Sequence, residues 1–280
     1  MEKVKSSNPQ ILNILKQKLK VTAVSYLNTK PFLYGIFKSG FGETIDLKLD
    51  IPSECARKLA SGEADLGLVP VAIIPELQTP HILSDYCIGA TGEVKTVCIF
   101  SQCPLEEITH LHLDFHSRTS VELAKILVKN HWQINPRLLP AEPGFEQKIT
   151  GTTAALIIGD RAVGMAEKCN YAYDLGEAWL DFTGLPFVFA AWVSNRPLDE
   201  AFLEGLNAAL KLGVEEIPEL MYILPAPQPG FDLRRYFTEN ISYELDEEKR
   251  RGMNLFLKFL KREDEANWIS GQFLQAQPMI

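Results

Sequence analysis

The sequence predicts an α/β protein of two lobes, because strand patterns alternate with helix patterns and two extended runs cross between them. Residues 44–50 alternate like a strand, residues 52–62 hold a helix with one apolar face, and residues 64–71 form a buried apolar run. A strand, helix and strand in this order imply a parallel sheet that contacts ligands at its carboxyl ends. Extended runs near residue 100 and near residue 188 have α/β patterns on both sides, as expected if the middle segment is a lobe inserted into the first.

We therefore expect residues 21–100 and 189–280 to form lobe I and residues 101–188 to form lobe II. Residues 1–20 form an N-terminal extension with five lysines and a short apolar pattern, to which no chemistry is assigned. Lobe II contains a strand and a helix within residues 111–130. From residue 197 onward, the chain is expected to be mainly helical.

Composition and charge exclude several classes of protein. No window approaches the ~20 consecutive apolar residues of a membrane span, and residues 1–20 lack the apolar core of a secretion signal. The five cysteines are scattered without a C-x-x-C pair, which favours a reducing cytoplasm over a disulfide framework. A net charge of -8 without a basic stripe argues against nucleic acid as a partner. An anionic ligand would need a few local donors, such as one arginine or a helix N-terminus.

Nucleotide, dinucleotide, serine-esterase and zinc-protease motifs are absent, so no cofactor is expected. One metal-like pattern occurs, in which His110, His112 and Asp114 alternate along a strand. We expect no metal there, because the apolar residues of the same strand, Leu111, Leu113 and Phe115, should face the core. The histidines would then lie on the outer face of the strand.

The strongest local signal is the polar turn Ser117, Arg118, Thr119 and Ser120, which lies between a strand and a helix. Thr119 and Glu122 have the spacing of a capping box, which would direct free backbone N–H groups out of the strand's carboxyl end. With the hydroxyls and the arginine, this turn could hold a carboxylate or phosphate. The alternative is an ordinary capped helix with a solvated arginine.

Two weaker signals lie in lobe I. Ser25, Tyr26 and Asn28 follow the strand expected at 21–24, where the Asn28 amide could both donate to and accept from a ligand oxygen. The alternative is a turn with a helix cap. Lys95 lies where the chain crosses between lobes, and its alternative is an exposed lysine.

Four ordered blocks carry a resemblance to a known family. The blocks are residues 25–31, 64–71, 117–121 and 179–188. Their order and spacing resemble those of the chorismate dehydratases of the futalosine route to menaquinone. The resemblance extends from about residue 20 to about residue 260. The resemblance implies a fold of the type II periplasmic-binding-protein class, with two α/β lobes, a double-strand hinge and a ligand cleft between the lobes.

The resemblance also implies roles for these residues. Asn28 would act at the reacting carbons, and the other members of the set would bind the substrate, chorismate, as it loses water to give 3-[(1-carboxyvinyl)oxy]benzoate. The substrate-binding residues that the resemblance implies are Ser25, Tyr26, Ser117, Arg118, Thr119 and Ser120. We also expect Lys95, Gly159 and Asp160 to bind the substrate. A small molecule is the only partner implied.

Two other functions are compatible with the same fold. A related dihydroxynaphthoate synthase carries its catalytic histidine in the second lobe, whereas the corresponding residues 138–145 contain no histidine here. A non-catalytic receptor for an organic anion would need export, and no export signal is evident in the sequence.

Overall fold

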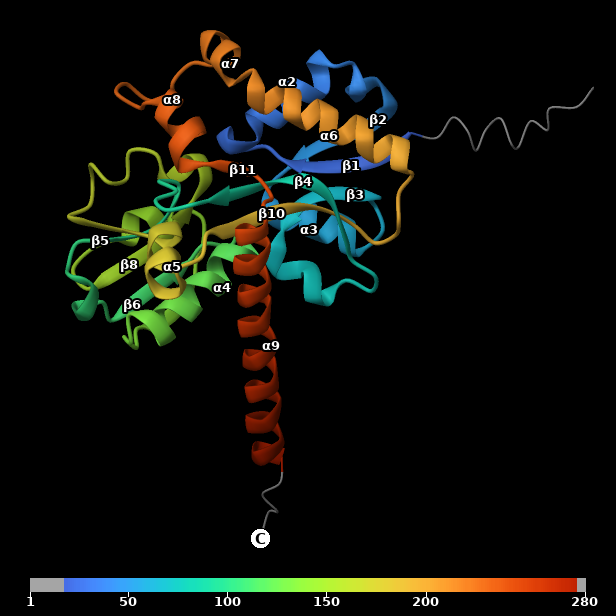
Figure 1. Cartoon of the computed structure of the whole chain (residues 1–280). Helices are drawn as coiled ribbons and strands as arrows, with labels where there is room; N and C mark the ends of the chain where they lie inside the picture. Colours follow the sequence, from blue (N-terminus) through green and yellow to red (C-terminus); the bar gives the residue numbers. More distant parts are fainter. Residues whose placement is uncertain (1–17, 276–280) are drawn as a thin grey trace, which may run out of the picture.

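The computed structural model describes residues 18–275, in which helices flank two β-sheets (Figure 1). The first sheet has the strand order β11-β4-β10-β3-β1-β2 and the second has the order β7-β6-β8-β5-β9. Strands of the first sheet are β1 Leu19–Val24, β2 Ile45–Asp50, β3 Leu66–Pro70, β4 His81–Ala90, β10 Phe187–Ser194 and β11 Ser242–Glu244. Strands of the second sheet are β5 Val97–Ser101, β6 His110–Leu113, β7 Arg137–Pro140, β8 Thr153–Ile158 and β9 Tyr171–Asp174.

Helices cover both sheets, and short 3-10 turns follow several strands. The α-helices are α2 Lys30–Lys38, α3 Pro52–Ala60, α4 Arg118–Ile126, α5 Leu175–Thr183, α6 Glu200–Glu215, α7 Ile217–Ile223, α8 Leu233–Arg235 and α9 Glu247–Gln275. The 3-10 turns that concern the site are η1 Leu27–Thr29, η3 Val71–Glu76 and η7 Gly159–Ala162. The strand over 45–50 and the helix that follows it confirm the predicted pattern.

The chain crosses between the sheets twice. It leaves the first sheet after β4 and returns to it as β10, whose eight residues are all buried. The predicted lobe I, ending at residue 100, included most of β5, but β5 pairs with β8 and β9 in the second sheet. We therefore propose that the crossings lie at residues 91–96 and 184–186. Most of the predicted extension, residues 1–17, lies outside the described residues, and β1 already begins at Leu19.

Helix α9 starts at the junction of the lobes and then stands out from the body (Figure 1). Its first turns contact β10 and η3 of the first lobe and α4 of the second. Met253, Phe256 and Leu260 are the buried hydrophobic residues of this part. The N-terminal turns of α9 therefore contact both lobes, and its C-terminal part points away from them.

Helices α2 and α6 cross with their backbones in contact, because glycines lie at the crossing. A Cβ atom at Gly213 would lie 1.9 Å from the Pro31 carbonyl oxygen, and one at Gly35 would lie 2.0 Å from the Ala209 carbonyl oxygen. Since both obstacles are backbone atoms, a side chain could be accommodated only by moving the helices apart. The crossing thus fixes the start of α2, which directly follows η1.

We predict that Gly213→Ala lowers the free energy of unfolding by about 1–3 kcal/mol, since it overpacks this crossing. Urea unfolding followed by circular dichroism measures the change. Gly92→Ala is the matched control, because a Cβ at Gly92 would meet no atom within 4 Å. Equal urea midpoints for the two variants would contradict the close crossing.

Candidate functional site

A cavity of about 50 Å³ lies between the two lobes, at the carboxyl ends of β1, β3 and β8. Proteins of the α/β class bind ligands at the carboxyl ends of their parallel strands. We call it the interlobe cavity; its lining residues are Val24, Tyr26, Asn28, Pro52, Pro70, Ile88, Val94, Thr96, Val97, Ser117, Ser120, Ile158, Gly159, Phe189 and Ala190.

The interlobe cavity combines an apolar wall with a few neutral polar groups. None of its lining side chains carries a formal charge. Aliphatic side chains, two prolines and Phe189 form the wall, and hydroxyl or amide groups come from Tyr26, Asn28, Thr96 and the two serines. Such a surface suits a small ring with polar substituents, because the wall can pack on the ring while the polar groups fix its orientation.

The two cavity serines shape the beginning of α4. Ser117 is the N-cap residue, and its Oγ accepts a hydrogen bond from the Ser120 backbone N–H at 3.2 Å. The predicted capping box of Thr119 and Glu122 is wrong, because the helix begins two residues earlier than that box requires. Glu122 instead pairs with Lys125 at 2.7 Å.

Thr119 is buried and bonds to lobe I, so it does not line the cavity. Its Oγ1 accepts a hydrogen bond from the Ala72 backbone N–H at 3.1 Å. Since its position lies in the first turn of α4, its own backbone N–H has no partner within the helix, and the same holds for Arg118. These N–H groups make the start of α4 a potential anion-binding element.

The segment Tyr26–Thr29 of lobe I lies against η7 of lobe II. A Cβ at Gly159 would meet the Tyr26 ring at 2.7 Å, and Gly159 has φ of +63°, so only glycine suits this contact. Asp160 does not line the cavity; its Oδ1 accepts a hydrogen bond from the Leu27 backbone N–H at 2.9 Å. Burial raises the pKa of the Asp160 carboxyl above its ordinary value.

The Tyr26 hydroxyl shares a hydrogen bond of 2.8 Å with His116 Nδ1 across the lobes. Burial, followed by the charge of Arg161, lowers the pKa of His116 from its ordinary value of 6.5. Burial raises the pKa of the Tyr26 hydroxyl, which therefore remains protonated. A neutral imidazole and a protonated phenol are the forms that make this bond at neutral pH.

A buried carboxylate supports His116. Asp114 accepts hydrogen bonds from the backbone N–H of His116 at 2.9 Å and of Ile158 at 3.1 Å, and it pairs with Arg161. The expectation that the histidines and Asp114 face outward is wrong for His112 and Asp114, which are buried. Strand β6 pairs in parallel with both of its neighbours, β7 and β8, and parallel strands are usually covered on both faces, which leaves no solvent side.

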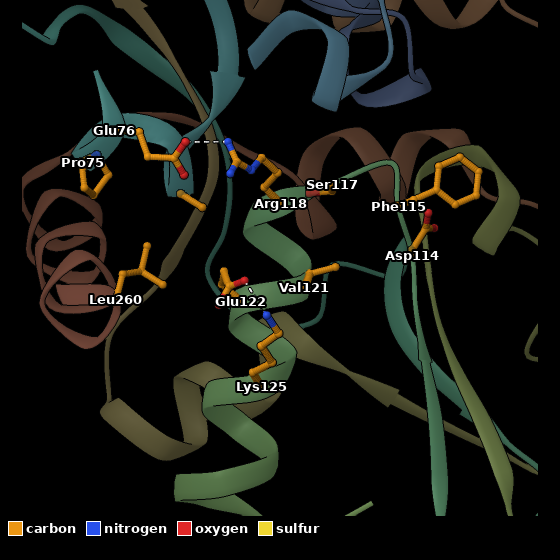
Figure 2. A pocket seen from close by; sticks show the side chains of 11 residues that line it. Pro75, Glu76, Asp114, Phe115, Ser117, Arg118, Val121, Glu122, Lys125 and Leu260 are labelled. Atoms are coloured by element: carbon orange, nitrogen blue, oxygen red, sulfur yellow. Dashed lines mark hydrogen bonds and ion pairs between the residues drawn. The ribbon is translucent and has the colours of Figure 1, made fainter. Parts of the chain in front are cut away.

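Arg118, which is predicted to bind the substrate together with Asn28, does not line the interlobe cavity. Its Nη1 lies 2.8 Å from Glu76 Oε2, and the two side chains are 50% and 55% exposed. Figure 2 shows Arg118 directed toward Glu76 in an outer pocket of about 600 Å³. Ser117 lines both pockets, so they adjoin at the start of α4.

Two further residues of the predicted set are also absent from the cavity lining. Lys95 has φ of +69° and pairs with Glu93, and its backbone N–H donates to Asp174 at 2.7 Å. Ser25 is exposed, and its backbone N–H donates to the Asp50 carbonyl at 3.0 Å. The predicted residues that do line the cavity are Tyr26, Asn28, Ser117, Ser120 and Gly159.

Sequence reasoning missed Thr96 and the apolar wall. Thr96 lines the cavity, and its hydroxyl shares a hydrogen bond of 3.0 Å with the buried Tyr236 hydroxyl. The one sequence feature that could have indicated Thr96 is its position next to Lys95, where the chain crosses between the lobes. The wall residues are contributed by strands of both sheets, which only the folded arrangement brings together.

Within residues 18–275 of the structure, no group of three or more His, Cys, Asp or Glu side chains could hold a metal ion. No helix among these residues is sufficiently long and apolar to cross a membrane. All five cysteines are free, and Cys98 and Cys103 are buried.

Residues 19–262 match a family model described as menaquinone biosynthesis. The chain belongs to this family. It is similar to the chorismate dehydratase of Thermus thermophilus, with 29% identity over 232 residues, which cover 75% of this chain and 84% of that protein.

The fold is that of periplasmic binding proteins. Protein AF1704 of Archaeoglobus fulgidus is similar with a TM-score of 0.63 and 15% identity, covering 90% of this chain and 98% of that one. The aliphatic sulphonate binding protein SsuA of Escherichia coli is similar with a TM-score of 0.57 and 12% identity, covering 88% of this chain and 87% of that one. These two likenesses concern the fold alone.

We predict that His116 makes stability depend on pH. Because its pKa is lower in the folded state than the ordinary 6.5, the unfolded chain takes up the proton first as the pH falls. The contribution of His116 is therefore complete above pH 6.5 and decreases below it. Urea midpoints at pH 7 and pH 5.5 should fall less in His116→Gln than in the wild type, and parallel losses would contradict this.

Proposed function

We propose that this protein is a chorismate dehydratase, a carbon-oxygen lyase that converts chorismate to 3-[(1-carboxyvinyl)oxy]benzoate in menaquinone biosynthesis. The observation that carries the proposal is the interlobe cavity, in which Asn28 of lobe I and Ser117 and Ser120 of lobe II line one apolar-walled space. Membership of the menaquinone family and the similarity to the Thermus enzyme support it. The cytoplasmic location expected from the sequence suits such a biosynthetic enzyme.

Chorismate is a dianion, and the cavity offers it neutral donors. Ser117 and Ser120 supply hydroxyls that line the cavity. The first turn of α4 adjoins them, and its backbone N–H groups at Arg118 and Thr119 would become accessible as the lobes separate. Helix N-termini stabilise anions through such N–H groups and the helix dipole. We assign one substrate carboxylate to this turn. The cyclohexadiene ring then packs against the apolar wall.

The lobes must separate to admit this substrate. The cavity holds about 50 Å³, whereas ligand pockets hold roughly 300–1,000 Å³. Opening would break the exposed Arg118–Glu76 ion pair and several hydrogen bonds across the lobes. Besides the Tyr26–His116 bond, these hydrogen bonds include Leu27 N–H to Asp160, Ala72 N–H to Thr119, and Ser53 N–H to the His116 carbonyl at 3.0 Å. Each is a single hydrogen bond, with a net contribution of about 1 kcal/mol, so ligand binding can offset their loss.

The reaction begins at C3 of chorismate, whose proton is vinylogous to the ring carboxylate. When the C3–H bond breaks, its electron pair moves into the conjugated carboxylate, where hydrogen-bond donors stabilise the charge. The electron pair then forms the C3–C4 double bond as the C4–O bond breaks. The hydroxyl leaves as water with the proton that the base took from C3, and the ring becomes aromatic. No carboxylate or histidine lines the cavity to take the C3 proton. The base in this proposal is therefore the substrate's own enolpyruvyl carboxylate, which Asn28 orients.

Two competing functions remain as outcomes of the test. A non-catalytic receptor for an organic anion has the support of the fold, since SsuA, a sulphonate binding protein, is a structural neighbour. A dihydroxynaphthoate synthase would need a catalytic histidine that residues 138–145 do not supply.

The direct test mixes the purified protein with chorismate and follows the ultraviolet spectrum and the products. We expect formation of the aromatic enolpyruvyl ether and water. Binding of chorismate without turnover would contradict the proposal and support a receptor. Absence of both binding and turnover would contradict it in favour of the related synthase.

Two variants serve as controls for the assignment of residues. Asn28→Ala should lower kcat by about 100-fold, because it removes an orienting amide at the reacting carbons. Arg118→Ala should change kcat and KM by less than about threefold, because Arg118 forms an exposed ion pair outside the cavity. A large loss of activity in Arg118→Ala alone would place the substrate in the outer pocket instead.

A further inference from the structure

We propose that Tyr243 is a positioning residue for Asn28: its hydroxyl holds the Asn28 backbone carbonyl and so fixes the amide side chain at the reaction centre. The inference rests on the proposed function, because it assumes that Asn28 acts on the substrate. It adds a residue of the C-terminal part of the chain, more than 200 residues away in sequence, to the site.

The contact is direct, and the tyrosine that makes it is buried. Tyr243 lies on β11, at the edge of the first sheet, with 4% of its surface exposed. Its hydroxyl donates a hydrogen bond of 3.0 Å to the Asn28 carbonyl oxygen. Burial raises the pKa of this hydroxyl well above its ordinary value, so it stays protonated and able to donate.

The Asn28 carbonyl needs a partner from outside its own helix. In a 3-10 turn, the carbonyl of residue 28 would accept from the N–H of residue 31, but residue 31 is a proline and has none. A buried carbonyl without a partner costs free energy. Tyr243 satisfies this carbonyl and determines the direction of the peptide unit next to the Asn28 side chain.

The Tyr243 ring is itself held in place. It packs edge-on against Phe32 with ring centroids 5.2 Å apart, and Phe32 is fully buried in the first turn of α2. The hydroxyl therefore cannot follow the carbonyl if the loop shifts. A fixed donor of this kind restricts the loop more than a mobile side chain would.

The hydrogen bond of Tyr243 also differs from the other hydrogen bonds of the segment Tyr26–Thr29. The hydrogen bonds of Tyr26 and of Leu27 N–H go to His116 and Asp160 of lobe II, and they break when the lobes separate. Tyr243 belongs to the same sheet as the strand that precedes Asn28, so its bond persists in the open state. The loop is therefore already ordered when substrate enters.

The test compares Tyr243→Phe with Tyr86→Phe. Tyr86 is a matched control, because it is buried and packs on the same Phe32 ring at 6.2 Å, yet its hydroxyl makes no hydrogen bond to Asn28 within residues 18–275. Tyr243→Phe should lower kcat with chorismate by roughly 10-fold to 100-fold and change KM little, as expected of misplaced catalytic groups. Tyr86→Phe should leave both constants unchanged.

A double-mutant cycle shows whether Tyr243 acts through Asn28. In the Asn28→Ala background, Tyr243→Phe should cause no further loss of kcat. Losses that multiply, or equal losses in Tyr243→Phe and Tyr86→Phe, would overturn the inference.

Hydrogen exchange separates this inference from the proposed function, because it needs no turnover. Tyr243→Phe should speed exchange of the backbone amides of residues 27–30 in the free protein, and Tyr86→Phe should not. If the wild type does not act on chorismate, the proposed function fails, and unchanged exchange in Tyr243→Phe would then overturn the positioning role as well.

Discussion

The placement of one short segment, Tyr26–Thr29, between two lobes is the constraint on which the site depends. From lobe II it is held through Tyr26 and Leu27, by His116, Gly159 and Asp160. From its own lobe it is held by Tyr243 and by the glycine crossing of α2 with α6. The contacts to lobe II can open while those within lobe I remain. Asn28 can therefore keep its position while substrate enters and leaves.

The distribution of charge explains how an acidic protein can bind a dianion without a cation in the cavity. Arg118 and Lys125 are paired with Glu76 and Glu122 in the outer pocket (Figure 2). Arg161 is paired with Asp114, which also accepts a hydrogen bond from the His116 backbone N–H. What remains at the cavity is the start of α4 with its N–H groups and serine hydroxyls. Fixed neutral dipoles in a closed, apolar space stabilise charge strongly, because no water competes with them.

The sequence predicted the fold class and much of the loop chemistry, because helix caps, strand periods and polar turns are local properties. Tyr26, Asn28, Ser117 and Ser120 were all found in this way. Strand β4 was missed, because its burial depends on β10 and β11, which are far away in sequence. The partners of Arg118, Thr119 and Lys95 also come from distant segments. The local sequence therefore indicated these residues as candidates but could not predict the direction of their side chains.

The most direct measurement of the central claim is a crystal structure of the Asn28→Ala variant with chorismate bound. The account predicts chorismate in the enlarged interlobe cavity, with one carboxylate within hydrogen-bond distance of the backbone N–H groups of Arg118 and Thr119. The cyclohexadiene ring of chorismate would lie against Phe189 and the neighbouring aliphatic side chains of the cavity wall. Chorismate bound instead in the outer pocket, with its carboxylate on the Arg118 guanidinium, would contradict the account.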